Sequence, residues 1–146
     1  MLTAETTRGL VFGVLLIHGL GHLGAIGALL WRASGRIAES DQAGWLAPRS
    51  WLLTNLDAPT TTWIASAFWL VAAFGFVVTA LSFWFEIPGP ETWRVVGVVA
   101  AVVSLTGMIT FVGTWPVFNT TAAAAVNLAV LLTQLWLRWP AIGVAR

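Results

Sequence analysis

Residues 9–31 read GLVFGVLLIHGLGHLGAIGALLW, a run of 23 residues without a formally charged side chain. As an α-helix this run would be roughly 34 Å long, enough to cross a hydrocarbon core of about 30 Å. It carries two histidines, His18 and His22, which stand four residues apart and therefore leave the same face of a helix. Because an ionisable side chain is costly to place at membrane depth, this stretch predicts both a membrane span and a candidate functional site.

The composition places the rest of the chain in the membrane class as well. Of 146 residues, 58% are hydrophobic and only 9% are charged, and the mean hydropathy is +0.85. The formal net charge of +1 is too small to indicate a nucleic-acid partner. Cysteine is absent from the sequence, which excludes disulfides, iron–sulfur ligation and cysteine-type zinc sites. We therefore expect one all-α integral membrane domain, residues 1–146, with the lipid bilayer as its solvent.

Three further apolar runs are bracketed by proline and tryptophan. They cover residues 62–85, 93–115 and 119–139, and all six prolines fall outside the four spans. Short connections between the last three spans favour antiparallel neighbours, so we predict an up-down four-helix bundle. Tryptophans near the predicted helix ends are typical of an aromatic belt at the membrane interface: Trp31, Trp63, Trp84, Trp93, Trp115, Trp136 and Trp139. Within the spans Trp69 alone lies deeper, where packing or a ligand must account for it.

The segment between the first two spans, residues 44–59, mixes tryptophan and leucine with a few charges. This composition predicts a short interfacial helix, with an ordered loop as the alternative. The opening span follows a nearly neutral segment and lacks a clean cleavage site, so we expect it to be retained. Four arginines fall on the side of the termini and three on the other, which favours the cell inner (plasma) membrane with both termini in the cytoplasm.

Few polar side chains lie inside the predicted spans. Asn127 in the fourth span needs a hydrogen-bond partner in hydrocarbon, and a histidine of the first span is one candidate. Ser104 and the row Thr106, Thr110 and Thr114 in the third span are more typical of hydroxyls that bond to their own backbone or join helices. The histidines themselves have two open interpretations, as structural hydrogen-bonding groups or as ligand-binding groups.

The candidate ligand-binding residues are His18, His22, Asn127 and Trp69. The two histidines could also ligate a metal ion, but two nitrogens without a nearby carboxylate or thiolate make an incomplete site, so metal is the weaker option. A haem or chlorin would find an axial imidazole in a glycine-lined groove, yet histidines one turn apart do not easily clamp one iron from both faces. A quinone-binding site requires only one imidazole as a hydrogen-bond donor, aromatic walls and small residues. The identity of the cofactor stays open between these.

The sequence has no nucleophile paired with a base, no phosphate-binding loop and no carboxylate pair in the spans. A non-hydrolytic protein is therefore expected, and a catalytic role is the weaker expectation. Gly9 and Gly13 form a GxxxG pattern, and the glycines that follow extend a flat helix face suited to a homo-oligomer or a partner subunit. The alternatives are a purely structural or oligomer-forming membrane subunit and a small-solute transporter, which would need an intramembrane carboxylate.

The size, the four spans, the first helix with its histidines and glycines, and the final hairpin GTWPVFNTTAAAAVNLAVLLTQLWLRWP at residues 113–140 resemble the small bacterial DoxX-like membrane proteins. The similarity is sharpest in that hairpin, with its Trp-Pro turn and its asparagine-containing last helix. The resemblance implies a four-helix bundle and a group whose founding members associate with quinone-linked sulfur oxidation or serve as redox accessory proteins. It implies no catalytic residues, and the absence of cysteine excludes a thiol-based role here.

Overall fold

The computed structural model describes residues 3–34, 48–87, 89 and 91–140, and within these ranges the secondary structure is entirely helical. Helix α1 spans Ala4–Ala33, α2 Ala58–Phe85, α3 Thr92–Thr110 and α4 Val117–Leu131, and a π-helical turn, η2, continues α4 over Leu132–Leu137. Each of the four helices, with α4 and η2 counted together, is long and apolar enough to cross a membrane. The predicted all-helical class with four candidate spans is confirmed.

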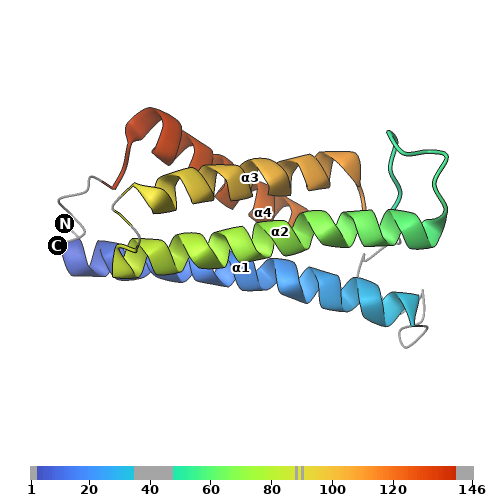
Figure 1. Ribbon diagram of the computed structural model, residues 1–146, viewed down its shortest axis with the longest axis horizontal. Coiled ribbons are helices and arrows are strands. Elements are labelled where there is room, and N and C mark those ends of the chain that lie inside the picture. The colour runs from blue at the N-terminus through green and yellow to red at the C-terminus, as the bar shows by residue number, and fades with distance from the viewer. Residues whose placement is uncertain (1–2, 35–47, 88, 90, 141–146) are drawn as a thin grey trace.

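The helices lie side by side along one long axis (Figure 1). α2 takes the middle of the packing order, because α1 and α3 both pack against it and α4 packs against α3. In Figure 1 the chain runs out along α1, back along α2, out along α3 and back along α4, so that the start of α1 and η2 lie at the same end. The backbones of α1 and α4 stay further apart than those of the other neighbouring helices.

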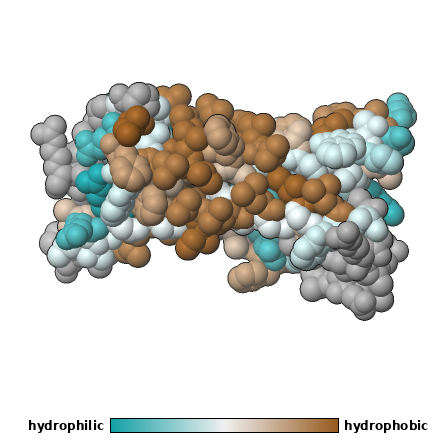
Figure 2. Space-filling model, turned by 60° about the horizontal axis from the view of Figure 1, so that its bottom comes forward, coloured by the Kyte–Doolittle hydropathy of each residue, from teal (hydrophilic) through white to brown (hydrophobic). Residues whose placement is uncertain are grey.

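The outer surface of the bundle is suited to lipid. Figure 2 shows hydrophobic side chains in a broad band across the middle of one face, with hydrophilic residues gathered toward the two ends. Large apolar side chains point outward from every helix, among them Ile17 at 71%, Phe74 at 71% and Val95 at 65% exposure. A soluble monomer rarely exposes apolar surface on this scale, so the band supports burial of the bundle in hydrocarbon.

Helix α3 ends earlier than residue 115, where the sequence predicted its end. Phe111 is its C-cap. Gly113 adopts a left-handed backbone conformation with φ of 81°, which residues that carry a Cβ atom rarely adopt. The Thr114 hydroxyl donates to the carbonyl of Phe111 at 2.9 Å and stabilises the turn. Trp115 therefore lies in the turn and packs inward with 8% exposure, and Trp93 is 5% exposed, so these two do not extend the predicted belt outward.

Residues 48–57 are the described part of the segment that the sequence predicted as an interfacial helix, while residues 44–47 lie outside the described residues. This part forms bends and turns. The Trp51 indole donates to the carbonyl of Ile109 at 2.8 Å, and Leu53 packs against the core, so the loop covers one end of the bundle. Asp57 then caps α2 by accepting the backbone N–H of Thr60 at 3.0 Å, and hydrogen bonds from Thr60 hold the pKa of the Asp57 carboxyl below its ordinary value.

Close contact between α2 and its neighbours depends on small residues. A Cβ atom added at Gly19 would lie 3.0 Å from the carbonyl oxygen of Ala73, and one added at Gly75 would lie 2.7 Å from the Cβ of Ala100. Fully buried alanines continue this small-residue surface along α2, namely Ala65, Ala72, Ala73 and Ala80. Small residues at helix contacts let backbones approach closely and gain dispersion energy, which replaces the hydrophobic effect as the packing force inside a membrane.

Gly19→Ala tests this packing. Its methyl group would meet the Ala73 carbonyl and the backbone nitrogen of Val77, which lies 3.1 Å away, and backbone atoms cannot rotate aside. We expect a loss of roughly 1–3 kcal/mol in the free energy of unfolding. The matched control is Gly24→Ala, because nothing lies within 4 Å of its added Cβ. Thermal unfolding in detergent followed by circular dichroism measures both, and equal melting temperatures for the two variants would contradict the close α1–α2 contact.

Candidate functional site: a buried polar chain beside a lipid-facing groove

Four polar side chains from three helices form a hydrogen-bonded chain near the middle of the bundle. His18 Nε2 lies 3.1 Å from Asn127 Oδ1, Asn127 Nδ2 donates to Ser104 Oγ at 2.8 Å, and Ser104 Oγ lies 3.2 Å from His22 Nε2. Asn127 and Ser104 are 0% exposed and His22 is 1% exposed. The chain thus begins and ends on α1 and runs through α4 and α3, which ties together helices that are distant in sequence.

Hydrogen-bond chemistry assigns the protons along this chain. An amide oxygen only accepts, so His18 must donate from Nε2 to Asn127. Ser104 Oγ accepts an amide proton from Asn127, and two acceptors lie within reach of its own proton, His22 Nε2 at 3.2 Å and the Met108 sulfur at 3.9 Å. We assign this proton to His22 Nε2, because an imidazole nitrogen is a stronger acceptor than a thioether sulfur. The sulfur of Met108, a weak acceptor 3.8 Å from Asn127 Nδ2, suits the second amide proton. His22 is then neutral, with Nε2 as acceptor and the proton on Nδ1.

One buried atom of this group, Nδ1 of His22, takes no part in the polar chain. It is buried and finds no hydrogen-bond partner among the described residues. By the proton assignment above it is an N–H donor. A buried donor without an acceptor costs about 1–3 kcal/mol, so an acceptor atom brought to this position would recover that energy. An orphaned polar atom of this kind points to a ligand-binding role for His22.

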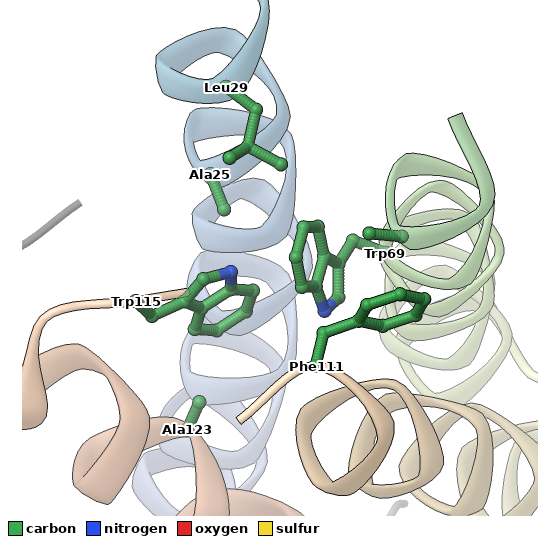
Figure 3. Packing of buried hydrophobic residues seen from close by; sticks show 7 residues of the cluster. Ala25, Leu29, Trp69, Phe111, Trp115 and Ala123 are labelled. Atoms are coloured by element: carbon green, nitrogen blue, oxygen red, sulfur yellow. The ribbon is translucent and has the colours of Figure 1, made fainter. Parts of the chain in front are cut away.

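Aromatic rings fix the orientation of both imidazoles. The ring of His22 stacks on Phe76 with centroids 6.0 Å apart and planes 7° apart, and it meets Trp115 at 5.3 Å. His18 meets the same Phe76 edge-on at 4.4 Å. Phe76 belongs to one apolar cluster of the core and Trp115 to the other, so the polar chain lies between two apolar layers. Figure 3 shows the second of these clusters, with Trp69, Phe111 and Trp115 converging beside α1.

A groove of about 320 Å³ between α1 and α4 reaches this polar chain. His18, His22 and the aromatic Trp115 line it, together with small residues such as Gly21 and Ala25. Its rim includes strongly exposed apolar side chains, Ile17 at 71% and Phe118 at 82% exposure. On a bundle that spans the membrane, such a rim faces hydrocarbon. An apolar molecule can therefore approach, from the lipid side, the wall of the groove that contains both histidines.

The structure brings three of the four candidate residues together. His18, His22 and Asn127 form one hydrogen-bonded unit, and the predicted pairing of Asn127 with a histidine is found. Trp69 lies apart from them in an apolar cluster, 5.1 Å from Trp115 between ring centroids, and it lines a separate cavity of about 60 Å³. Its indole nitrogen is buried without a hydrogen-bond partner among the described residues. Trp69 therefore supports the site through Trp115 rather than lining its groove.

Sequence reasoning missed Ser104 as the link between Asn127 and His22. The signal that could have found it is the run of small residues at helical spacing on α3, which marks the buried face: Gly97, Ala100, Ala101, Ser104 and Gly107. Thr106 lies off this face. It is exposed and its hydroxyl donates to the carbonyl of Val102 on its own helix at 2.8 Å, which is the backbone-bonded role that the sequence favoured for this hydroxyl.

For metal binding, the geometry offers little beyond the two imidazoles. The described residues contain no group of three or more histidine, cysteine, aspartate or glutamate side chains placed to hold an ion. The Nε2 atoms of His18 and His22 both take part in the polar chain. The arrangement is better suited to donating one hydrogen bond into an apolar groove than to coordinating a cation.

No protein-family model matches the chain, and no significant match was found among curated proteins or solved structures. The function is therefore inferred from the chemistry of the site.

Replacing Ser104 tests the polar chain. Ser104→Ala would leave an amide proton of Asn127 and Nε2 of His22 without partners, so we expect a loss of roughly 1–2 kcal/mol in the free energy of unfolding. Thr106→Val is the matched control on the same helix, since its hydroxyl serves only its own backbone. We expect that control to stay within about 0.5 kcal/mol of the parent. Chemical or thermal unfolding in detergent distinguishes the two variants. A Ser104 variant as stable as its control would contradict the hydrogen-bonded polar chain.

Proposed function

We propose that this protein is an integral membrane protein that binds an apolar, oxygen-bearing ligand in the groove between α1 and α4. The observation that carries the proposal is the buried, unpaired Nδ1–H of His22 beside a groove with an apolar rim. A carbonyl oxygen is the acceptor that such a donor suits best. The ligand would enter laterally from the bilayer between α1 and α4, and its oxygen would accept a hydrogen bond from His22 Nδ1.

The size and the lining of the groove favour a single flat ring. Its volume of about 320 Å³ lies at the lower end of the range for ligand pockets, about 300–1,000 Å³. Aromatic walls beside His22 suit a ring, and Gly21 leaves space for it against α1. A quinone-like ligand fits these features better than a haem or chlorin, because a macrocycle of four pyrrole rings needs more room than a groove at the lower end of the pocket range provides.

Two considerations from the sequence bear on this proposal. The resemblance to the DoxX-like proteins implies a redox-associated, quinone-linked setting, which agrees with a quinone-like ligand. A small-solute transporter is less favoured, because the described parts of the four spans carry no carboxylate beyond their ends. A purely structural role would leave the unpaired donor of His22 unexplained.

We further propose an up-down bundle in the inner (plasma) membrane with both termini in the cytoplasm. At the end of the bundle that holds the start of α1, two arginines each form an ion pair with a glutamate. Arg8 lies 3.6 Å from Glu86, and Arg94 lies 3.0 Å from Glu91. Arginine at the cytoplasmic side is the usual arrangement in membrane proteins, and by sequence the four-span topology assigns one more arginine to the side of the termini than to the other side, which supports the orientation.

His22→Phe tests the ligand proposal. Phenylalanine keeps a flat ring between Phe76 and Trp115 but removes the Nδ1 donor, so affinity for a dimethoxy-methyl para-benzoquinone should fall about tenfold, the equivalent of one hydrogen bond. Leu20→Phe places the same side chain on the outer face of α1 and serves as control. Isothermal titration in detergent measures both. The quinone should also bind more tightly than its hydroquinone, because a carbonyl oxygen only accepts, whereas a hydroxyl that accepts the Nδ1 proton also brings its own proton into an apolar groove.

Two results would count against this proposal. Equal affinity of parent and His22→Phe for the benzoquinone would show that His22 does not hold the ligand. A Soret band in the absorption spectrum of the purified protein would favour haem instead.

A partner subunit bound along α1 is a second candidate, and it has its own observation. Cβ atoms added at Gly9, Gly13, Gly24 and Gly27 would meet nothing within 4 Å, so these glycines form a flat strip open to another helix. Gly13→Leu and Gly24→Leu should then weaken self-association or partner binding. Sedimentation velocity in detergent reports the size of the particle, and an unchanged size for both variants would remove this candidate.

A further inference from the structure

A second hollow continues the histidine groove toward the end of the bundle that holds η2. It has a volume of about 270 Å³ and is lined by residues of α1, α2, α3, α4 and η2. Val14 and Val126 line both this hollow and the histidine groove, so the two spaces adjoin. A ligand with its head at His22 has direct access to this second space.

The lining of the second hollow is that of a hydrocarbon site. The described residues around it include no charged side chain, and most are valine, leucine, alanine or an aromatic residue. Its two threonines turn their hydroxyls back to their own helices, Thr79 to the carbonyl of Gly75 at 2.7 Å and Thr133 to that of Ala129 at 2.7 Å. The space therefore presents methyl and methylene surface rather than hydrogen-bonding groups.

The far end of this hollow is closed by a fixed piece of chain. Trp139 and Pro140 line it there, and both backbone carbonyls are held. Gln134 Nε2 donates to the carbonyl of Trp139 at 3.0 Å, and the Arg94 guanidinium donates to that of Pro140 at 2.7 Å. Arg94 also donates to the side-chain oxygen of Gln134 at 3.0 Å. These bonds give the hollow a definite end near the membrane surface.

We propose that the ligand of the histidine groove carries a linear hydrocarbon tail, alkyl or isoprenoid, and that the first part of this tail lies in the second hollow. The proposal rests on the function proposed above and adds the class of ligand and the direction in which it lies. From His18 to Leu10 along α1 is about 12 Å, which accommodates roughly ten methylene groups before the closed end. A longer tail would turn outward between α1 and α4 into the bilayer.

Photochemical cross-linking in lipid nanodiscs tests the position of the tail on the full-length chain. The probe is a decyl para-benzoquinone with a diazirine near the middle of the tail, and cross-linked peptides are mapped by mass spectrometry. We expect labels on α1 between Leu10 and Val14 and on α4 and η2 between Val126 and Thr133. Excess tail-free benzoquinone should suppress this labelling, because the head holds the tail in place.

A pair of phenylalanine variants on α4 sharpens the test. Both alanines are exposed and lie one turn apart, but Ala129 lines the second hollow, which Ala129→Phe would fill, whereas Ala125, the site of the control Ala125→Phe, lines neither space. The first should reduce labelling inside the hollow by about threefold or more, because an extra ring overpacks the space, and the second should leave it unchanged. Both should bind the tail-free benzoquinone like the parent.

The outcomes separate this inference from the proposed function. If His22→Phe leaves binding of the tail-free benzoquinone unchanged, the proposed function fails and the tail site fails with it. If that binding is lost as expected but labels fall only on outward-facing residues, the tail inference alone fails. Labelling of the hollow that a diazirine fatty acid reproduces, and that tail-free benzoquinone does not suppress, would show an ordinary membrane lipid in the hollow and would also overturn the inference.

Discussion

Hydrocarbon offers no hydrogen bond to a polar side chain, and this constraint organises the bundle around Asn127. Its amide has to find partners inside the protein, and it finds them on two other helices at once, in His18 and Ser104. Ser104 in turn reaches His22. Because the unpaired alternative would cost several kcal/mol per group, the depth and rotation of α1, α3 and α4 are coupled to one another at this level.

The apolar packing follows from the same geometry. Helices can bring short polar side chains together only where their backbones approach closely, and small residues on α2 and α3 provide that approach, as at Gly75 against Ala100. Phe76 then fills the space beside both imidazoles. Between α1 and α4 the side chains of His18 and Asn127 bridge a wider space, so the backbones stay apart and the two hollows remain. The groove is thus a consequence of how the polar chain is supported.

Much of this architecture could be predicted from the sequence, because apolar runs and prolines report directly on helices in a membrane. The histidine pair and Asn127 were identifiable for the same reason, since each is conspicuous in an apolar run. Ser104 was not, because a serine in a membrane helix can satisfy itself on its own backbone and only the three-dimensional packing shows that it does otherwise. The end of α3 was placed too late, because the apolar run continues through the turn at Gly113. That turn also places Trp115, rather than Trp69, in the lining of the groove, which the sequence did not predict.

The exposed rim of the groove, with Ile17 and Phe118 turned outward, has a consequence for how affinity would be measured. A molecule that enters through this rim comes from the bilayer, where its concentration is set by partitioning rather than by the amount dissolved in water. Two compounds with equal contacts to the protein would then show different apparent dissociation constants if their partition coefficients differ. The ratio of lipid or detergent to protein becomes a thermodynamic variable of the same standing as ligand concentration.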